Sequence, residues 1–235
     1  MSVEIITATS KGVYDDFLEV NEYNCKKLGY KYIVYETQSV DWWKDGQVGI
    51  GQIQGLPKPQ IIYDHIKNQC QSEYCIWIDI DAIIRKKIDE ILINDIVCTP
   101  RLHNHILPPD TFIHLINNGI MVFRKTEKLY PFFEKWINNI KEDDNVKYES
   151  SGEEHHFSKL VCDIDHKWLL NHGWGQELVL PRKPQYIFGN IGVSFVDTRI
   201  YNQYYTFQDL DIAKIYHFKG EFRDKYRHLL PKFKM

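Results

Sequence analysis

The sequence predicts an α/β fold with a mostly parallel central sheet flanked by helices. Short β-branched, apolar runs alternate with segments whose apolar residues recur at helical spacing, which is the pattern of β-α-β units. The run at residues 74–78 is apolar throughout, as expected for a strand buried on both faces. The 235 residues, 43% hydrophobic and 26% charged, have the composition of a globular protein rather than of a disordered or coiled-coil chain.

The first part of the sequence is expected to form a strand, a helix and a second strand. Residues 3–9 are apolar and β-branched, and helical spacing follows them until Gly29 closes the helix. Residues 30–35 predict the second strand, while residues 39–57 have no clear period and are interpreted as a loop. A further helix, with isoleucines four residues apart, then leads into the buried strand.

The second part adds short strands and further helices. The candidate strands are residues 96–99, residues 119–123 and the surroundings of Tyr186, Val193 and Ile215. A helix with one apolar face is expected at residues 129–140, and another helical stretch at residues 157–170. The charged, Gly- and Ser-containing residues 141–154 favour a mobile surface loop. Residues 219–234 form a basic tail.

Charge and cysteine usage narrow the class of protein. Lys+Arg 29 against Asp+Glu 32 gives a net charge of -3, so the basic excess needed to bind a nucleic-acid backbone is missing, and we expect no such partner. No uncharged stretch approaches the roughly 20 residues of a membrane span. The cysteines are odd in number and form no Cys-x-x-Cys pair, which indicates reduced thiols in a soluble, cytoplasmic protein. They are Cys25, Cys70, Cys75, Cys98 and Cys162.

One of three Asp-x-Asp triplets follows a strongly apolar strand. The triplets are Asp79/Asp81, Asp163/Asp165 and Asp209/Asp211. Only the first stands where a parallel strand would end, at the edge where open α/β sheets bind ligands. Two carboxylates one residue apart can hold Mg²⁺ or Mn²⁺ and leave coordination sites for the oxygens of a diphosphate. The alternative is a helix N-cap before Ile83.

Four sequence patterns follow one another along the chain: ITATSKGVY, KPQIIYDHIKN with YCIWIDIDAII, NNGIMVFR and IYHFKG. Together they resemble the retaining, nucleotide-sugar-dependent glycosyltransferases of the GT-A fold, whose families contain glycogenin, the lipopolysaccharide galactosyl- and glucosyltransferases and the xyloglucan xylosyltransferases. In order, they are similar to the uridine-binding element, the segment ending in the metal-binding Asp-x-Asp motif, the donor-sugar strand and the late His-x-x-Gly element. The resemblance implies one domain at 1–235, with a nucleotide-binding half at about 1–100 and a donor-sugar and acceptor half at about 101–235.

The resemblance implies a metal site and a diphosphate site. Asp79 would contact the ribose and the metal, Asp81 would bind the metal directly, and His217 would be the third protein ligand. An imidazole beside two carboxylates favours Mn²⁺ over Mg²⁺, because nitrogen ligands suit the softer ion. A hydrogen-bonded histidine at a strand end is the other interpretation of His217. Lys219 and Gly220 would follow it to the diphosphate, although Lys219 equally suits a solvated surface.

The same resemblance places other residues around the nucleotide and the donor sugar. The residues expected around the uridine are Thr7, Ala8, Thr9 and Tyr14. Tyr14 equally suits the core beneath a helix. Lys58, ahead of the second helix, would reach the donor, and Asn118 and Gly119 would face the donor sugar.

Residues 172–177 (HGWGQE) stand where these relatives have an Asp-Gln or Glu-Gln pair near the anomeric carbon. Gln176 would lie at the β-face of the donor sugar and Glu177 would bind or orient a hydroxyl, and either residue equally suits a helix cap. Because aromatic rings cover the apolar faces of sugars, an acceptor surface is also expected. Its candidate residues are Trp42, Trp43, His155, His156 and Trp174. The two adjacent histidines are also a candidate second metal site.

The expected function is the metal-dependent transfer of a hexose or pentose from a UDP-sugar to a hydroxyl of a glycan or glycoconjugate, with retention. The metal and Lys219 would stabilise the diphosphate leaving group, and residues 39–57 and 141–154 would close as lids against water. The bases that an inverting outcome would indicate are Glu177, Glu153 and Glu154. One alternative is a metal-dependent nucleotidyltransferase or phosphatase, for which ITATSKG supplies no phosphate-binding glycine loop. The other is a non-catalytic glycan-binding protein of the same fold.

Overall fold

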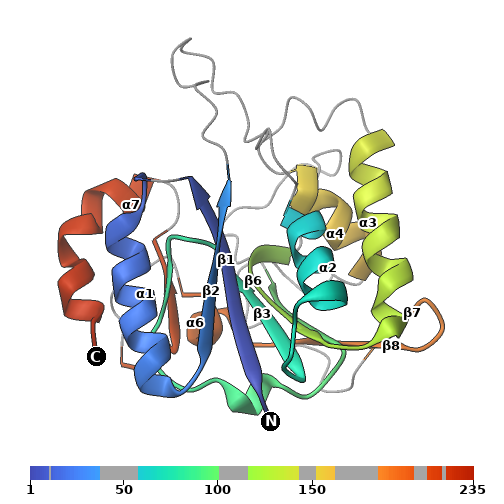
Figure 1. Ribbon diagram of the computed structural model, residues 1–235, viewed down its shortest axis with the longest axis horizontal. Helices are drawn as coiled ribbons and strands as arrows, with labels where there is room; N and C mark the ends of the chain where they lie inside the picture. The colour runs from blue at the N-terminus through green and yellow to red at the C-terminus, as the bar shows by residue number, and fades with distance from the viewer. Residues whose placement is uncertain are drawn as a thin grey trace, which may run out of the picture.

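The computed structural model describes residues 1–10, 12–37, 58–100, 116–142, 152–161, 185–203, 211–218 and 221–235. Across these residues a seven-stranded sheet in the order β2-β1-β3-β6-β5-β8-β7 forms the centre of the molecule (Figure 1). Its strands are β1 (Val3–Ser10), β2 (Lys31–Thr37), β3 (Tyr74–Ile78), β5 (Ile96–Pro100), β6 (Ile116–Arg124), β7 (Gln185–Ile187) and β8 (Ile191–Phe195). A two-stranded sheet joins β4 (Ala82–Ile84) to β9 (Ile215–His217).

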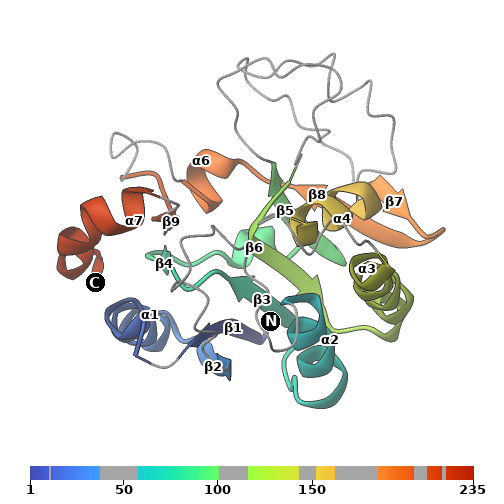
Figure 2. The same cartoon turned by 90° about the horizontal axis from the view of Figure 1, so that it is seen from above.

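The helices divide between the two faces of the large sheet (Figure 2). One face is covered by α2 (Lys58–Asn68), α3 (Tyr130–Glu142) and α4 (Gly152–Val161). The other face is covered by α1 (Asp15–Leu28), α6 (Thr198–Tyr201) and the β4–β9 pair. Beside α1 lie α7 (Glu221–Tyr226) and the 3-10 helix Arg227–Phe233, and two shorter 3-10 helices are Asp89–Ile91 and Glu127–Leu129.

Five of the seven described strands of the large sheet run in one direction. β1 pairs in parallel with β2 and β3, and β5 pairs in parallel with β8. β6 is antiparallel to both of its neighbours, and β7 is antiparallel to β8. The expected α/β fold with a mostly parallel sheet between helices is therefore confirmed. β3 is buried, as its apolar sequence predicts, but it is parallel only to β1 and antiparallel to β6. An apolar run indicates burial and not the direction of the neighbouring strand.

Local sequence patterns account for the end of α1 and for the burial of β3. Gly29 has φ of 79°, in the left-handed region, and its N–H donates to a carbonyl of the last turn of α1, as expected for a closing glycine. Every residue of β3 is buried. The two faces of the sheet carry separate apolar clusters, one beneath α2, α3 and α4 and the other beneath α1.

Packed aromatic rings hold α3 and α4 against the sheet. The ring centroids of Phe133 and Phe123 are 5.0 Å apart, and those of Trp136 and Phe157 are 4.7 Å apart. These four side chains are fully buried. The apolar face expected at residues 129–140 therefore lies on the core, as its helical spacing predicts.

Two expectations about polar segments are corrected by the structure. The ends of the expected loop at residues 141–154 are helical, because Lys141 and Glu142 finish α3 and α4 begins at Gly152. Glu153 and Glu154 lie in the first turn of α4, where acidic residues are favourable. The basic tail is also structured: α7 and the following 3-10 helix return to α1, and Leu230 is buried. Residues 39–57, 143–151 and 162–170 lie outside the described residues.

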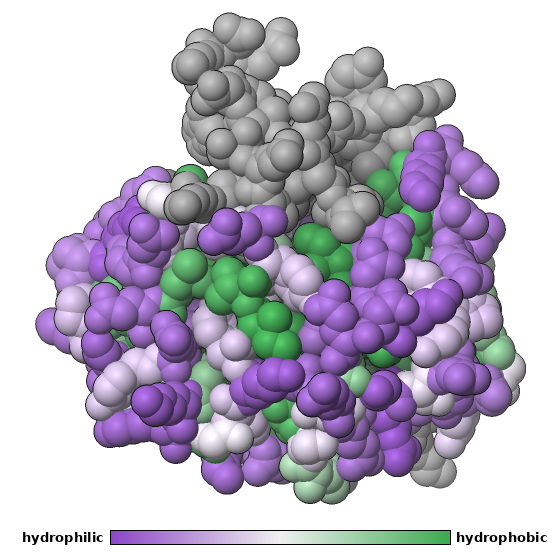
Figure 3. All heavy atoms as spheres, viewed as in Figure 1, coloured by the Kyte–Doolittle hydropathy of each residue, from purple (hydrophilic) through white to green (hydrophobic). Residues whose placement is uncertain are grey.

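The four cysteines that the structure describes, Cys25, Cys70, Cys75 and Cys98, are buried free thiols, as expected, and Cys162 lies outside the described residues. Among the described helices, none has the length and apolar character to span a membrane. The face of the molecule in Figure 3 is mostly hydrophilic, with a small apolar band over the edge strand β2, whose residues 32–35 are half-buried.

Candidate metal and donor site

A turn between β3 and β4 places two carboxylates at the carboxyl end of the central strands. The N–H of Asp79 donates to the carbonyl of Gly119 on the neighbouring β6, at 2.7 Å. The N–H of Ala82 donates back to the carbonyl of Asp79 at 2.9 Å, which closes the turn between Asp79 and Asp81. The alternative of a helix N-cap is wrong, because the chain continues into strand β4 rather than into a helix.

Strand pairing brings His217 to these carboxylates. β9 runs antiparallel to β4 with His217 opposite Ala82, and the N–H of Phe218 donates to the carbonyl of Asp81 at 2.8 Å. His217 Nε2 consequently lies 3.1 Å from Asp81 Oδ1 and 3.9 Å from Asp79 Oδ2. Ligand atoms of all three residues lie within 4.8 Å of one another.

Hydrogen bonds on the far side of the imidazole set its orientation. His217 Nδ1 is 3.0 Å from Asn202 Oδ1, and the amide nitrogen of Asn202 donates to Thr99 Oγ1 at 2.7 Å. Because the oxygen of Asn202 can only accept, Nδ1 carries a proton, and Nε2, on the opposite side of the ring, is directed at Asp81 and lies within hydrogen-bond distance of its Oδ1. Two carboxylate oxygens and an imidazole nitrogen that converge in this way fit a divalent cation such as Mn²⁺.

Gly119 lies directly against this histidine. A Cβ at Gly119 would be 2.4 Å from His217 Cε1 and 2.8 Å from Nδ1, distances that real Cβ atoms do not show. The position expected to face the donor sugar therefore also lets β6 approach the imidazole ring closely. Asn118, the preceding residue, is 2% exposed and its side-chain oxygen accepts from Lys58 at 3.2 Å.

Lys58 opens α2, is buried, and forms two salt bridges with partly exposed carboxylates. Its Nζ lies 2.8 Å from Asp79 Oδ1 and 3.0 Å from Glu153 Oε1. Burial alone would lower the pKa of Lys58, but the carboxylates of Asp79 and Glu153 outweigh it and hold this pKa well above its usual value. Lys58 is thus a fixed cation at the site. Glu153, a candidate inverting base, instead binds this lysine.

Asp79 is held in its ionised form. Burial would raise its pKa, but Lys58 in first place, then His217 and the indole of Trp77, lower the pKa of Asp79 to about 2. Asp79 Oδ1 accepts hydrogen bonds from Lys58 and from Trp77 Nε1, at 2.8 and 2.9 Å. The other oxygen, Oδ2, is the one that faces His217.

Arg223 of α7 completes the charged surroundings, and sequence patterns did not single it out. Its Nη1 donates to Asp81 Oδ2 at 3.4 Å, and its guanidinium lies 5.2 Å from the ring of Tyr14. Among the described residues Arg223 Nε has no hydrogen-bond partner. The only signal for it was a basic residue six positions after His217, within the segment interpreted as a tail.

The residues expected around the uridine lie at the same edge of the sheet. Thr7 and Thr9 are buried in the last part of β1, which pairs there with β2, and Ala8 packs against the core beneath α2. Tyr14 is the N-cap residue of α1 and packs edge-on against Phe17, with centroids 6.0 Å apart. Burial raises the pKa of Tyr14. The ring of Tyr14 is half-buried, so it fits both interpretations of this residue, a core side chain beneath the helix and a contact for the nucleotide.

Several expected site residues lie outside the described residues. These are Gln176, Glu177, Lys219, Gly220, Trp42, Trp43 and Trp174, together with the side chain of His155. His156 was expected in a loop of the acceptor surface, but it belongs to α4 and is 6% exposed. A helix that packs against the sheet buries it there, which removes His156 from the surface.

Solved structures share this fold. A glycosyltransferase involved in the glycosylation of the major capsid of PBCV-1 is 13% identical with a TM-score of 0.59, over 97% of this chain and 99% of that protein. The glycosyltransferase GlyE of Streptococcus pneumoniae TIGR4 is 9% identical with a TM-score of 0.61, over 100% of this chain, which spans 60% of GlyE. The galactosyltransferase LgtC, solved with donor and acceptor sugar analogs, is 8% identical with a TM-score of 0.51, over 99% and 96% of the two chains.

The sequence itself has no comparable match. No protein-family model matches the chain, and no curated protein matches it. The likeness to the solved structures therefore concerns the fold, and on that level it agrees with the arrangement of strands and helices described above. The chain has the α/β fold of these glycosyltransferases, and the expected GT-A fold is confirmed.

Proposed function

We propose that this chain is a metal-dependent glycosyltransferase that moves a sugar from a UDP-sugar to a hydroxyl of a glycan or glycoconjugate, with retention. The observation that carries the proposal is the convergence of Asp79, Asp81 and His217 Nε2 at the carboxyl end of the central strands. Ligands of open α/β sheets bind at that edge. The shared fold supports the same class of reaction, hexosyl or pentosyl transfer.

The ion that suits this site is Mn²⁺ or Mg²⁺, and the imidazole favours Mn²⁺. When bound, it would supply positive charge to the diphosphate leaving group as negative charge develops there. Asp79 and Asp81 would hold it together with His217, and Asn202 would keep the ring of His217 in the required tautomer.

Other residues of the chain would position the donor. Lys58 fixes Asp79 in its ionised form and orients its free oxygen towards His217. Arg223 lies beside Asp81 with an Nε that has no partner among the described residues, so its guanidinium would add a donor for a diphosphate oxygen. Lys219 and Gly220 remain candidates for the diphosphate, and Gln176 and Glu177 for the donor sugar.

Calorimetry of UDP binding tests the metal site. We expect wild-type protein to bind UDP only with Mn²⁺ present, because the diphosphate and the carboxylates repel one another without a cation. Asp81→Asn should lose this binding. Asp211→Asn is the matched control, since Asp211 belongs to another Asp-x-Asp triplet and is exposed. UDP affinity that is unchanged by Asp81→Asn or by excess chelator would refute the metal site.

Turnover separates the proposed activity from its alternatives. Incubation with UDP-sugars, Mn²⁺ and a panel of glycan acceptors should release UDP and give a product whose anomeric configuration, read by NMR, matches the donor. Release of pyrophosphate from a nucleoside triphosphate would instead indicate a nucleotidyltransferase. Glycan binding without any UDP release would indicate a non-catalytic binding protein, and an inverted product would refute retention.

A further inference from the structure

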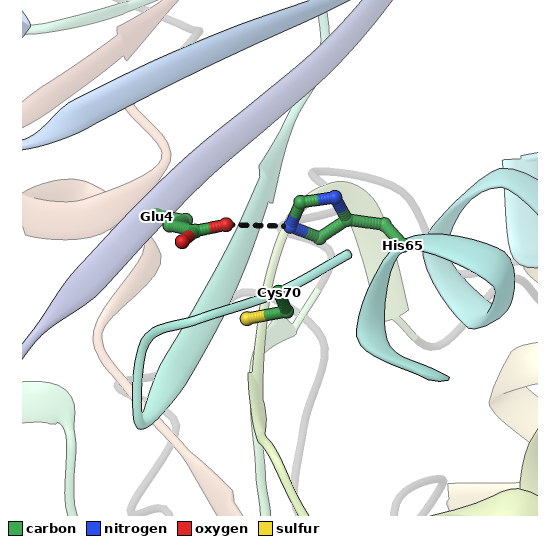
Figure 4. A group of neighbouring side chains, drawn as sticks. All are labelled: Glu4, His65 and Cys70. Carbon is green, nitrogen blue, oxygen red and sulfur yellow. Dashed lines mark ion pairs between the residues drawn. The ribbon is translucent and has the colours of Figure 1, made fainter. Parts of the chain in front are cut away.

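A second group of metal-ligand side chains lies at the opposite end of the strands from Asp79 and Asp81. Glu4 comes from the start of β1, His65 from the last turn of α2 and Cys70 from the connection between α2 and β3 (Figure 4). Ligand atoms of these three residues lie within 4.8 Å of one another. The side chains of Glu4 and His65 are 1% and 0% exposed, and Cys70 is buried.

Glu4 and His65 face each other without a hydrogen bond. His65 Nε2 lies 2.9 Å from Glu4 Oε2. Figure 4 marks this contact as an ion pair. The contact does not have hydrogen-bond geometry, and neither atom has a hydrogen-bond partner among the described residues. Buried polar atoms of this kind are rare in folded proteins and require an explanation.

The partner of His65 Nδ1 shows which ring nitrogen carries the proton. The Tyr35 hydroxyl donates its single hydrogen to Gln69 Oε1 at 2.9 Å, so its oxygen accepts from His65 Nδ1 at 2.8 Å. The Nε2 of the neutral ring therefore presents a lone pair to the Glu4 carboxylate. A lone pair and a carboxylate oxygen that face each other at this distance require either a proton or a metal ion to bridge them.

The remaining contacts leave the inward-facing atoms available. Glu4 Oε1 accepts from the N–H of Gln71 at 3.1 Å, from Ser72 Oγ at 3.4 Å and from Lys31 Nζ at 3.3 Å. These bonds anchor one oxygen of the carboxylate and leave Oε2 directed at His65. Cys70 Sγ makes one weak hydrogen bond, to the carbonyl of Ser72 at 3.5 Å.

We propose that Glu4, His65 and Cys70 bind a Zn²⁺ ion. A thiolate, an imidazole nitrogen and a carboxylate oxygen are the three ligand types of protein zinc sites, and water would take the fourth position. The thiolate distinguishes this group from Asp79, Asp81 and His217, whose harder donors suit Mn²⁺ or Mg²⁺. Bound Zn²⁺ would tie β1 to the end of α2 and to the connection that leads into β3.

Absorption spectroscopy with Co²⁺ as the probe tests this site specifically, because a thiolate ligand gives an intense charge-transfer band that oxygen and nitrogen ligands do not give. Full-length Asp81→Asn protein, which lacks a ligand of the other group, should show the band at one equivalent of Co²⁺, as should wild type. Cys70→Ser should abolish it. Cys25→Ser is the matched control, since Cys25 is also a buried free thiol, on α1, and should keep the band.

Thermal unfolding gives an independent readout. Zn²⁺ should displace Co²⁺ and raise the melting temperature of Asp81→Asn, but not that of the Asp81→Asn/Cys70→Ser double variant. If Cys70→Ser does not fold, His65→Gln replaces it and should weaken Co²⁺ binding by at least ~10-fold. Absence of the band in wild type with excess Co²⁺ would overturn the proposal and indicate a proton shared between Glu4 and His65. A band that survives Cys70→Ser would also overturn it.

Discussion

Gly119 sets how closely β6 can approach the imidazole of His217. We predict that Gly119→Ala leaves the fold intact but lowers metal-dependent UDP affinity by at least ~10-fold, because a Cβ 2.4 Å from His217 Cε1 must displace the ring. Calorimetry of Mn²⁺ and UDP measures the affinity, and circular dichroism controls for folding. Undiminished affinity in a folded variant would show that the ring position does not matter for binding.

The salt bridge between Asp79 and Lys58 makes a pH-dependent contribution to the free energy of unfolding. The pKa of Asp79 falls from 3.8 to about 2 in the folded state, so the contribution is full above about pH 4 and is lost as the pH falls towards 2. That shift corresponds to about 2 kcal/mol of the free energy of unfolding. Lys58→Met removes the main partner of Asp79, so the free energy of unfolding of this variant should depend less on pH between about pH 4 and pH 2.

Urea unfolding of both proteins at a series of pH values, in chelator, checks this prediction. The other carboxylates titrate in both proteins, so the quantity to compare is the difference between the two curves. Curves that stay parallel between pH 4 and pH 2 would show that Lys58 does not depress the pKa of Asp79.

At the scale of single elements, Asn24 of α1 joins three segments of the chain. Its amide nitrogen donates to the carbonyls of Ile84, at 2.8 Å, and Phe233, at 2.9 Å, and its oxygen accepts from the N–H of Met235 at 3.0 Å. We predict that Asn24→Ala lowers the free energy of unfolding by about 2 to 3 kcal/mol, since each lost hydrogen bond contributes about 1 kcal/mol.

Asn138→Ala is the matched control for Asn24→Ala, because Asn138 is exposed on α3. Urea unfolding should show almost no change for it. An equal effect of the two substitutions would mean that the hydrogen bonds of Asn24 do not hold the C-terminal segment to α1.

Elements with a local signal were predictable from the sequence, and elements defined by distant pairing were not. β3 and the carboxylates after it follow from an apolar run that ends in Asp79. β4 and β9 have three residues each, too few to show alternation, and each exists because it pairs with the other. The position of His217 was therefore expected from a resemblance rather than from its own surroundings.

The partners of the site residues were beyond local patterns for the same reason. Asn202 and Arg223 reach His217 and Asp81 only once α6 and α7 are in place. Glu153 lies in a charged stretch that suggested a loop, but the first turn of α4 places its carboxylate beside Lys58. Charge patterns identify polar residues, but tertiary packing decides which of them are buried together.

At the scale of the whole molecule, both halves of the chain contribute to one sheet. Ile96 of β5 pairs with Val193 of β8, and the C-terminal residues pack on α1. We propose a single domain and predict one cooperative unfolding transition, with coincident far- and near-ultraviolet circular dichroism. Two separated transitions would indicate that the two halves of the chain fold independently.

Helix α2 contacts both groups of candidate metal ligands, with Lys58 at its first residue and His65 in its last turn. If each group binds its ion, the two sites are thermodynamically linked through a shared element. If bound Zn²⁺ changes the affinity for UDP and Mn²⁺ by some factor, then bound UDP and Mn²⁺ must change the affinity for Zn²⁺ by the same factor. Titrating Zn²⁺ before UDP and Mn²⁺, and then in the reverse order, would give the coupling free energy between the two ends of the sheet.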